Sequence, residues 1–144
     1  MATTTAARTP AQTASAAVGI VFLLVAVLGF VPGITTGALD GAGHDSSALL
    51  LGIFQVSVLH NIVHLLFGVA GLAMARTHGG ARSFLVWGGA VYLVLFLYGL
   101  FVAGPNPANF VPVNAADNIL HLVLGIGMLA LGLALGRRGH TARV

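Results

Sequence analysis

Histidine, aspartate, serine and asparagine residues recur at helical spacing inside two apolar stretches of this 144-residue sequence. Residues three or four positions apart share one face of a helix. In the first stretch this face carries Ser57, His60, Asn61 and His64. In the second stretch it carries Asn114, Asp117, Asn118 and His121. Polar groups cost free energy against lipid, so we expect these residues, which we call the polar seam, to face the protein interior or a shared cavity.

The polar seam suggests more than one kind of chemistry. Ser, Asn and His commonly form hydrogen bonds between membrane helices, each worth about 1 kcal/mol or less. We favour this structural or interaction role, in which Asp117 pairs with His60 and the asparagines bond across the seam. Imidazole and carboxylate groups also bind transition metals, for which the candidate ligands are His60, His64, Asp117 and His121.

Two further uses of the histidines are open. His64 and His121 stand at matching positions, each followed four residues later by glycine, and they are candidate axial ligands of a haem. A His and Asp cluster inside a membrane also suits a proton relay, because histidine titrates near neutral pH. A proton or small-solute conduit is therefore a further alternative to the structural role.

The sequence favours a protein without catalytic activity. Asp117 is the one carboxylate within an apolar stretch, and no motif combines a nucleophile, a base and an orienting group. The chain has no cysteine, which excludes disulfides, thiolate metal ligands and cysteine nucleophiles. All of its obligate positive charge comes from arginines outside the apolar stretches, so a nucleic-acid partner is not expected.

Four apolar stretches are long enough to cross a bilayer as helices, which takes about 20 residues. The chain is 58% hydrophobic and 6% charged, a composition typical of proteins whose solvent is lipid. The predicted spans are residues 14–31, 48–75, 84–103 and 114–135, with tails at 1–13 and 136–144. We therefore predict an all-α integral membrane protein, a four-helix bundle in contact with the lipid bilayer. A homo-oligomer or another membrane protein is a possible further partner.

The distribution of arginine predicts that both termini are cytoplasmic. Positive residues concentrate in the cytoplasmic segments of membrane proteins. Arg8 precedes the first span, Arg76 and Arg82 lie between the second and third, and the remaining arginines follow the fourth. The other two connections lack arginine, and the first of them contains Asp40, His44 and Asp45, which we interpret as a solvated turn. The predicted topology is therefore a multi-pass membrane protein whose N-terminus and C-terminus both face the cytoplasm.

The two halves of the polar seam are also related by sequence. Residues 61–68 read NIVHLLFG and residues 118–125 read NILHLVLG, with five of eight positions identical. The preceding spans match more loosely, with positions 19, 21, 23 and 29 falling on 89, 91, 93 and 99. This similarity predicts one helical hairpin used twice, as parallel repeats about an axis along the membrane normal.

The paired histidine blocks carry a family resemblance. The first block is HNIVH at residues 60–64 and the second is DNILH at residues 117–121. Together with the four-span layout, they resemble the bacterial family known as domain of unknown function 4383, from about residue 16 to residue 136. The resemblance implies four transmembrane helices and a location in the inner (plasma) membrane of a bacterium. It implies no particular activity, cofactor or ligand.

Overall fold

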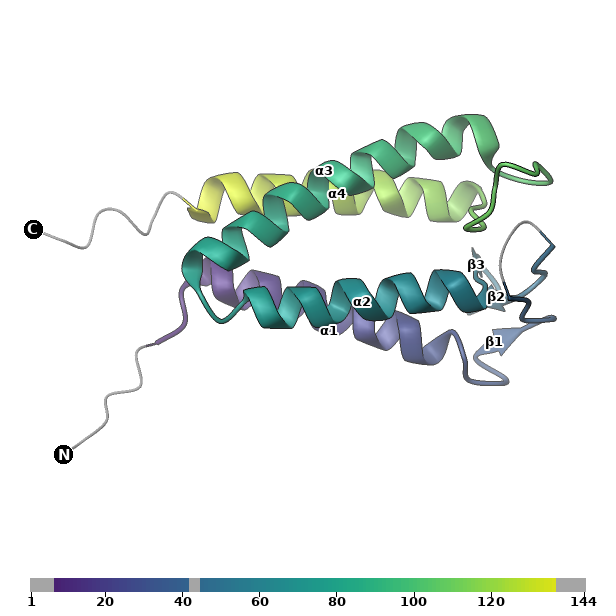
Figure 1. Cartoon of the computed structure of the whole chain (residues 1–144), viewed down its shortest axis with the longest axis horizontal. Helices are drawn as coiled ribbons and strands as arrows, with labels where there is room; N and C mark the ends of the chain where they lie inside the picture. The colour runs from purple at the N-terminus through teal and green to yellow at the C-terminus, as the bar shows by residue number, and fades with distance from the viewer. Residues whose placement is uncertain (1–6, 42–44, 137–144) are drawn as a thin grey trace, which may run out of the picture.

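The computed structural model of the chain describes residues 7–41 and 45–136. Its main elements are four helices, α1 (Pro10–Leu28), α2 (Val58–Met74), α3 (His78–Val102) and α4 (Ala115–Gly136). They lie along one long axis as two pairs, α1 with α2 and α3 with α4 (Figure 1). The all-α class expected from the sequence is confirmed for these helices. Most of the two expected tails, residues 1–6 and 137–144, lies outside the described residues.

Each pair of helices forms a hairpin. We call α1, α2 and the residues 29–57 between them the first hairpin, and α3, α4 and the residues 103–114 between them the second hairpin. The start of α1, the turn from α2 to α3 and the end of α4 lie at one end of the structure (Figure 1). We call the other end the strand end, because it carries the short strands β1 (Thr35–Thr36), β2 (Leu49–Leu50) and β3 (Phe54–Gln55).

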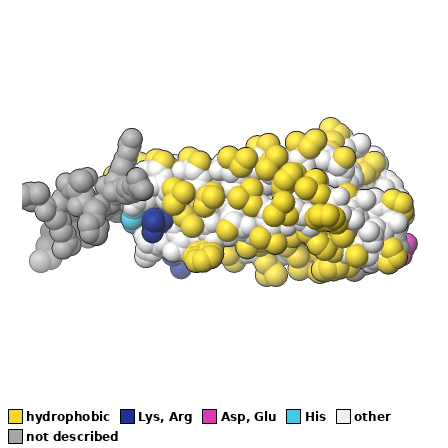
Figure 2. All heavy atoms as spheres, turned by 90° about the horizontal axis from the view of Figure 1, so that it is seen from above, with side chains coloured by type: hydrophobic (Ala, Val, Ile, Leu, Met, Phe, Trp, Pro, Cys, Tyr) yellow, Lys and Arg dark blue, Asp and Glu magenta, His cyan; other side chains and the backbone are white. Residues whose placement is uncertain are grey.

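Of the described helices, α1, α3 and α4 are long and apolar enough to cross a membrane. Helix α2 has 17 residues, which is the short limit for bilayer spans of about 17–25 residues. Hydrophobic side chains cover much of the face seen in Figure 2, and arginines appear at the end opposite the strand end. The outer surface is therefore compatible with a membrane protein, as the composition indicates.

Helix α2 begins at Val58, whereas the apolar pattern predicts a span from residue 48. Residues 49–55 instead contain two of the three strands of a small antiparallel sheet, in which β2 pairs with both β1 and β3. Leu51 and Gly52 turn the chain at φ values of 55° and 70°, in the left-handed region that a helix interior does not use. The prediction differed because hydropathy alone does not distinguish a short apolar strand from a helix.

Side-chain caps set where the long helices begin. The Thr9 hydroxyl accepts a hydrogen bond from the Gln12 amide at 3.3 Å, and the Gln12 side chain accepts one from the Thr9 amide at 3.0 Å. This capping box starts α1 at Pro10. The Thr77 hydroxyl caps α3 in a similar way. Both helices therefore begin earlier than the spans expected at residues 14 and 84, because a polar first turn lies outside an apolar window.

Glycines bring the helices of each hairpin into backbone contact. A Cβ atom added to Gly19 of α1 would lie 2.9 Å from the carbonyl oxygen of Gly68 in α2. A Cβ added to Gly89 of α3 would lie 2.9 Å from the carbonyl oxygen of Gly125 in α4. These separations are too short for a real side chain, so each hairpin requires glycine where its helices cross. Between the hairpins lies a core that contains Phe22, Phe84, Leu85, Tyr92 and Met128.

Candidate functional site

The polar seam lies near the strand end, where α2 and α4 begin. Seven of its side chains are buried and Asn114 is partly buried. Ser57 and Asn114 do not lie within helices, although the sequence pattern groups them with the helical positions. The Ser57 hydroxyl accepts a hydrogen bond from the His60 amide at 3.1 Å and caps α2. The Asn114 side chain accepts one from the Asp117 amide at 3.0 Å, immediately before α4 begins.

Two hydrogen bonds from helical residues of the polar seam join the hairpins. The His60 imidazole, on α2, donates from Nδ1 to the carbonyl oxygen of Pro112 at 3.1 Å. The Asp117 carboxylate, on α4, accepts from the backbone amide of Gln55 at 2.9 Å. Proline has no N–H, so a side chain that reaches the Pro112 backbone has to donate, whereas the Gln55 amide needs an acceptor. The imidazole and the carboxylate are therefore matched to the backbone groups they meet.

A third contact strengthens the same junction. The Asn114 side-chain amide donates to the carbonyl oxygen of Ile53 at 2.7 Å, again from the second hairpin to the first. The Asp117 oxygen that binds Gln55 also accepts from the Asn114 amide at 3.0 Å. One oxygen atom of Asp117 thus accepts two hydrogen bonds, one from the residue before its own helix and one from the connection of the other hairpin.

The expected pairing of Asp117 with His60 is wrong. Each of these residues binds backbone of the opposite hairpin instead. The physical reason is that α2 and α4 pack mainly against their own hairpin partners, α1 and α3, rather than against each other. Helical periodicity identifies the face on which a residue lies, and it does not identify what that face meets.

The expected hydrogen bonds between the asparagines are also not formed. A Cβ atom added to Gly29 would overlap the Asn61 amide, and one added to Gly99 would overlap the Asn118 amide. Both asparagines are thus packed against glycine in their own hairpin. Among the described residues, Nδ2 and Oδ1 of Asn61 and Oδ1 of Asn118 are buried without hydrogen-bond partners.

Replacing Asn61 with leucine is expected to raise the free energy of unfolding by about 1 kcal/mol, because a buried, unpaired amide gives way to an apolar group of similar shape. Asn109 provides the matched control. It is fully buried, but its amide makes three hydrogen bonds to backbone of its own connection. Asn109→Leu is therefore expected to lower the same free energy by about 2–3 kcal/mol in denaturant titrations in detergent. Equal losses in both variants would contradict this assignment.

His64 and His121 contact a stacked aromatic pair. The Phe22 ring of α1 lies 5.5 Å from the His64 ring, and the Tyr92 ring of α3 lies 5.3 Å from the His121 ring. Phe22 and Tyr92 stack on each other at 5.4 Å with an interplanar angle of 21°. The sequence analysis did not identify these two residues. The alignment that matches Gly19 with Gly89 also matches position 22 with position 92. This match was the feature of the sequence that could have identified them as an equivalent pair.

Two cavities adjoin the histidines. Chamber A, of about 160 Å³, lies between α1 and α4 and is lined in part by His60, His64, Asp117 and His121. Chamber B, of about 110 Å³, lies between α2 and α3 and is lined in part by the same histidines with Tyr92 and Tyr98. Both chambers are smaller than the pockets of about 300–1,000 Å³ that hold drug-sized ligands, so neither accommodates a haem unless the helices separate.

The metal-ligand role finds no support in the geometry. Within residues 7–41 and 45–136, no three His, Cys, Asp or Glu side chains are grouped so that they could hold a metal ion. His60, His64, Asp117 and His121 as metal ligands, His64 and His121 as haem ligands, and the conduit all stay predictions. In the acidic connection, the exposed Asp40 accepts a hydrogen bond from the Gly41 amide, and His44 lies outside the described residues.

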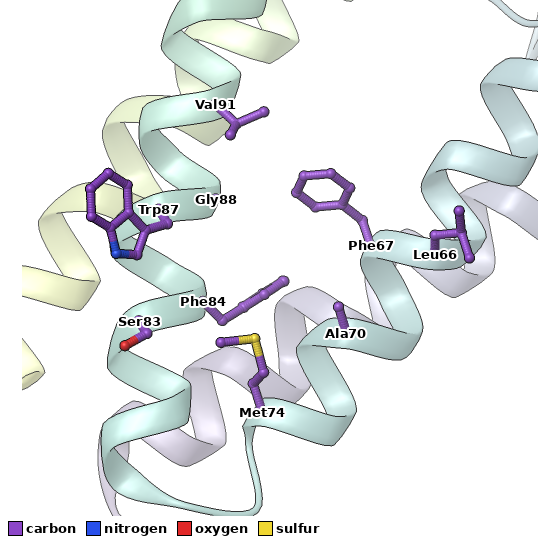
Figure 3. A pocket seen from close by; sticks show the side chains of 9 residues that line it. All are labelled: Leu66, Phe67, Ala70, Met74, Ser83, Phe84, Trp87, Gly88 and Val91. Carbon is purple, nitrogen blue, oxygen red and sulfur yellow. The ribbon is translucent and has the colours of Figure 1, made fainter.

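A larger groove lies on the outer surface between α2 and α3. It has a volume of about 380 Å³, and Phe67 from α2 and Phe84 from α3 project into it (Figure 3). Its other lining residues are apolar or small, with Ser83 as the one hydroxyl. The groove offers no titratable group, so the chemistry of the protein has to be sought in the polar seam.

Comparison with known proteins relates the chain to one family. A sequence model of the family described as Domain of unknown function (DUF4383) matches residues 12–134, which cover nearly all of both hairpins. Neither the curated proteins nor the solved structures contain a match.

Proposed function

Because the chain belongs to the DUF4383 family, whose description assigns no activity, we propose a function from the polar seam itself. The protein is a four-span membrane protein, and the seam fastens two copies of one helical hairpin together. Its role is structural or in interaction with other membrane components rather than catalytic. The observation that carries this proposal is the pair of bonds from His60 to Pro112 and from Gln55 to Asp117.

The reciprocity of these bonds supports the use of one hairpin twice. His60 and Asp117 are separated by 57 positions, and so are their partners Gln55 and Pro112. Each helix therefore sends its matching side chain to the matching backbone position of the other hairpin. Two elements related by a twofold axis make such reciprocal contacts. Donor and acceptor are exchanged between the two bonds, as the proline requires.

Contacts inside the hairpins recur at matching positions as well, which further supports the duplication. The pairs are Gly19–Gly68 with Gly89–Gly125, Leu23–Gly68 with Leu93–Gly125, Gly29–Asn61 with Gly99–Asn118, and Phe22–His64 with Tyr92–His121. In this arrangement the stacked Phe22 and Tyr92 rings lie at the axis that relates the hairpins.

We assign α2 as the fourth span despite its length. A 17-residue helix is about 25 Å long, close to the hydrocarbon thickness of about 30 Å. Its outward residues are apolar, with Ile62, Leu65, Leu66 and Val69 exposed. Exposed Leu51 and Ile53 continue the apolar surface beyond its first turn. The turn between β2 and β3 therefore supplies the apolar length that the helix lacks.

The proposed orientation places the strand end outside the cell and both termini in the cytoplasm of a bacterium. Arg76 and Arg82 lie at the end opposite the strands, and Asp40 lies in the connection at the strand end. The excess of positive charge is typical of the cytoplasmic side.

Single cysteines test this orientation cleanly because the chain has none of its own. Gly41 lies in the connection at the strand end, and Gly79 lies in the first turn of α3 at the opposite end. A Cβ atom added to either meets no atom within 4 Å. In intact cells, or in spheroplasts where an outer membrane intervenes, an impermeant maleimide is expected to label Gly41→Cys. Gly79→Cys is expected to react only after permeabilisation. Labelling of Gly79→Cys alone, or of both in intact cells, would contradict the proposed topology.

A further inference from the structure

Chamber A combines an apolar lining with hydrogen-bonding groups. Ten of its lining side chains are apolar, and they come from α1, α4, β2, β3 and the residues beside these strands. The four polar lining residues are His60, His64, Asp117 and His121. Fastening the hairpins uses Nδ1 of His60 and one oxygen of Asp117. The other polar atoms of these four side chains take no part in joining the hairpins.

The imidazoles of His60 and His64 present acceptors rather than donors. Nδ1 of His60 is bonded to the Pro112 carbonyl, and Nδ1 of His64 is bonded to the His60 carbonyl at 3.0 Å. A carbonyl only accepts, so each Nδ1 carries the hydrogen and Nε2 of each neutral ring is an acceptor. His121 is only 6% exposed, and its Nδ1 has no hydrogen-bond partner among the described residues. In the tautomer that carries its hydrogen on Nε2, this buried nitrogen is an acceptor, and a molecule that donates a hydrogen bond would satisfy it.

The size of chamber A sets the size of its occupant. An apolar cavity of about 150 Å³ in another protein holds one benzene molecule, and chamber A has about 160 Å³. Val21 and Leu24 line it and are 52% and 55% exposed, so the chamber borders the apolar outer surface of α1. A molecule dissolved in the membrane can therefore approach it from that side.

The lining of chamber B explains why the two chambers differ in volume. The repeat alignment places Leu95 and Tyr98 of chamber B where chamber A has Val25 and Leu28. Both replacements are larger side chains, and chamber B has the smaller volume of about 110 Å³. The tyrosine ring thus fills space that stays open in chamber A.

We propose that chamber A binds one small neutral molecule with a ring-sized apolar body and a hydroxyl group, for which phenol is the simplest example. The ring contacts the apolar lining, and the hydroxyl donates its hydrogen bond to the unpartnered imidazole nitrogen of His121. The site goes beyond the fastening role, because it uses atoms that the bonds between the hairpins leave unused.

Fluorine NMR of the full-length protein in detergent tests this site with 4-fluorophenol and fluorobenzene as probes. Saturable binding of 4-fluorophenol at one site is expected, with an affinity about tenfold or more above that of fluorobenzene. Absence of saturable binding, or equal affinity for the two probes, would overturn the proposal, because detergent partitioning alone is not saturable and does not require the hydroxyl acceptor.

Two variants locate the site. His121→Phe keeps an aromatic ring against Tyr92 and is expected to abolish the preference for 4-fluorophenol over fluorobenzene. The double variant Val25→Leu and Leu28→Tyr gives chamber A the residues of chamber B and is expected to abolish saturable binding. A preference that survives in His121→Phe, or binding that survives in the double variant, would overturn the assignment. Circular dichroism and monodisperse elution establish that each variant is folded. The comparison of the two probes on the wild-type protein tests the proposal even if neither variant folds.

Discussion

Replacing Asp117 with alanine is expected to lower the free energy of unfolding by about 3 kcal/mol. The substitution leaves the part-buried amides of Gln55 and Asn114 without their shared acceptor, and an unpaired amide that is shielded from water costs about 1–3 kcal/mol. It also removes one of the two side-chain hydrogen bonds through which the second hairpin holds the connection of the first. Denaturant titration in detergent, followed by circular dichroism, measures the loss.

The chain offers two controls for this substitution. Asp117→Asn keeps a side-chain oxygen that can accept a hydrogen bond, so its loss is expected to be smaller than that of Asp117→Ala. Asp40 is exposed, and its carboxylate accepts a hydrogen bond from the amide of the next residue, so Asp40→Ala is expected to change stability by less than about 0.5 kcal/mol. If Asp117→Ala were as stable as Asp40→Ala, the carboxylate would not be joining the hairpins.

Replacing Gly89 with valine is expected to destabilise the second hairpin by about 3 kcal/mol. A Cβ atom at this position would lie 2.7 Å from the Leu129 amide nitrogen and 2.9 Å from the Gly125 carbonyl oxygen. These are backbone atoms, so they can move only if α3 and α4 separate, and the packing between the helices is lost. Unfolding curves are expected to shift to lower denaturant concentration.

Gly127 is the matched control for the glycine contact. It lies on the same helix as Gly125, but a Cβ added there meets no atom within 4 Å. Gly127→Ala is expected to leave stability unchanged or to raise it by up to about 1 kcal/mol through helix propensity. Equal destabilisation by Gly89→Val and Gly127→Ala would show that close backbone approach does not hold the hairpin.

Residue spacing predicted which polar side chains are buried, but it did not predict their partners. The three-and-four spacing of His60, Asn61 and His64 identifies one helix face, and polar groups on that face avoid lipid by turning inward. The partners of His60 and Asp117 are backbone groups at Pro112 and Gln55. Backbone groups are present at every position, so no sequence pattern distinguishes the ones that are used.

The limits of the helices were less predictable than their existence. Hydropathy located α1, α3 and α4, because a span is a long uninterrupted apolar run. It extended α2 across residues 48–56, where the chain forms strands around Leu51 and Gly52. Ser57 was the residue from which the start of α2 could have been predicted, since serine is a favoured N-cap residue.

The sequence repeat had more predictive value than any single motif. Matching the histidine blocks also matches the glycine contacts and the aromatic partners, although the first and third spans share few identical residues. If the hairpins are two copies of one unit, as we propose, residues at matching positions meet the same local surroundings, so contacts persist where side chains differ. Phe22 and Tyr92 illustrate this, because different aromatic rings occupy these two matching positions.

The distance between the hairpins at the strand end tests the fastening role most directly. Spin labels at Ile53→Cys in the first hairpin and Phe101→Cys in the second report this distance by electron paramagnetic resonance, since both positions are exposed and the chain has no other cysteine. Labels at Phe101→Cys and Ile119→Cys, both in the second hairpin, provide the control. When His60 and Asp117 are both replaced by leucine, we expect the distance distribution between the hairpins to broaden and lengthen while the control distribution is unchanged. An unchanged distribution between the hairpins would contradict the proposal that the polar seam fastens them together.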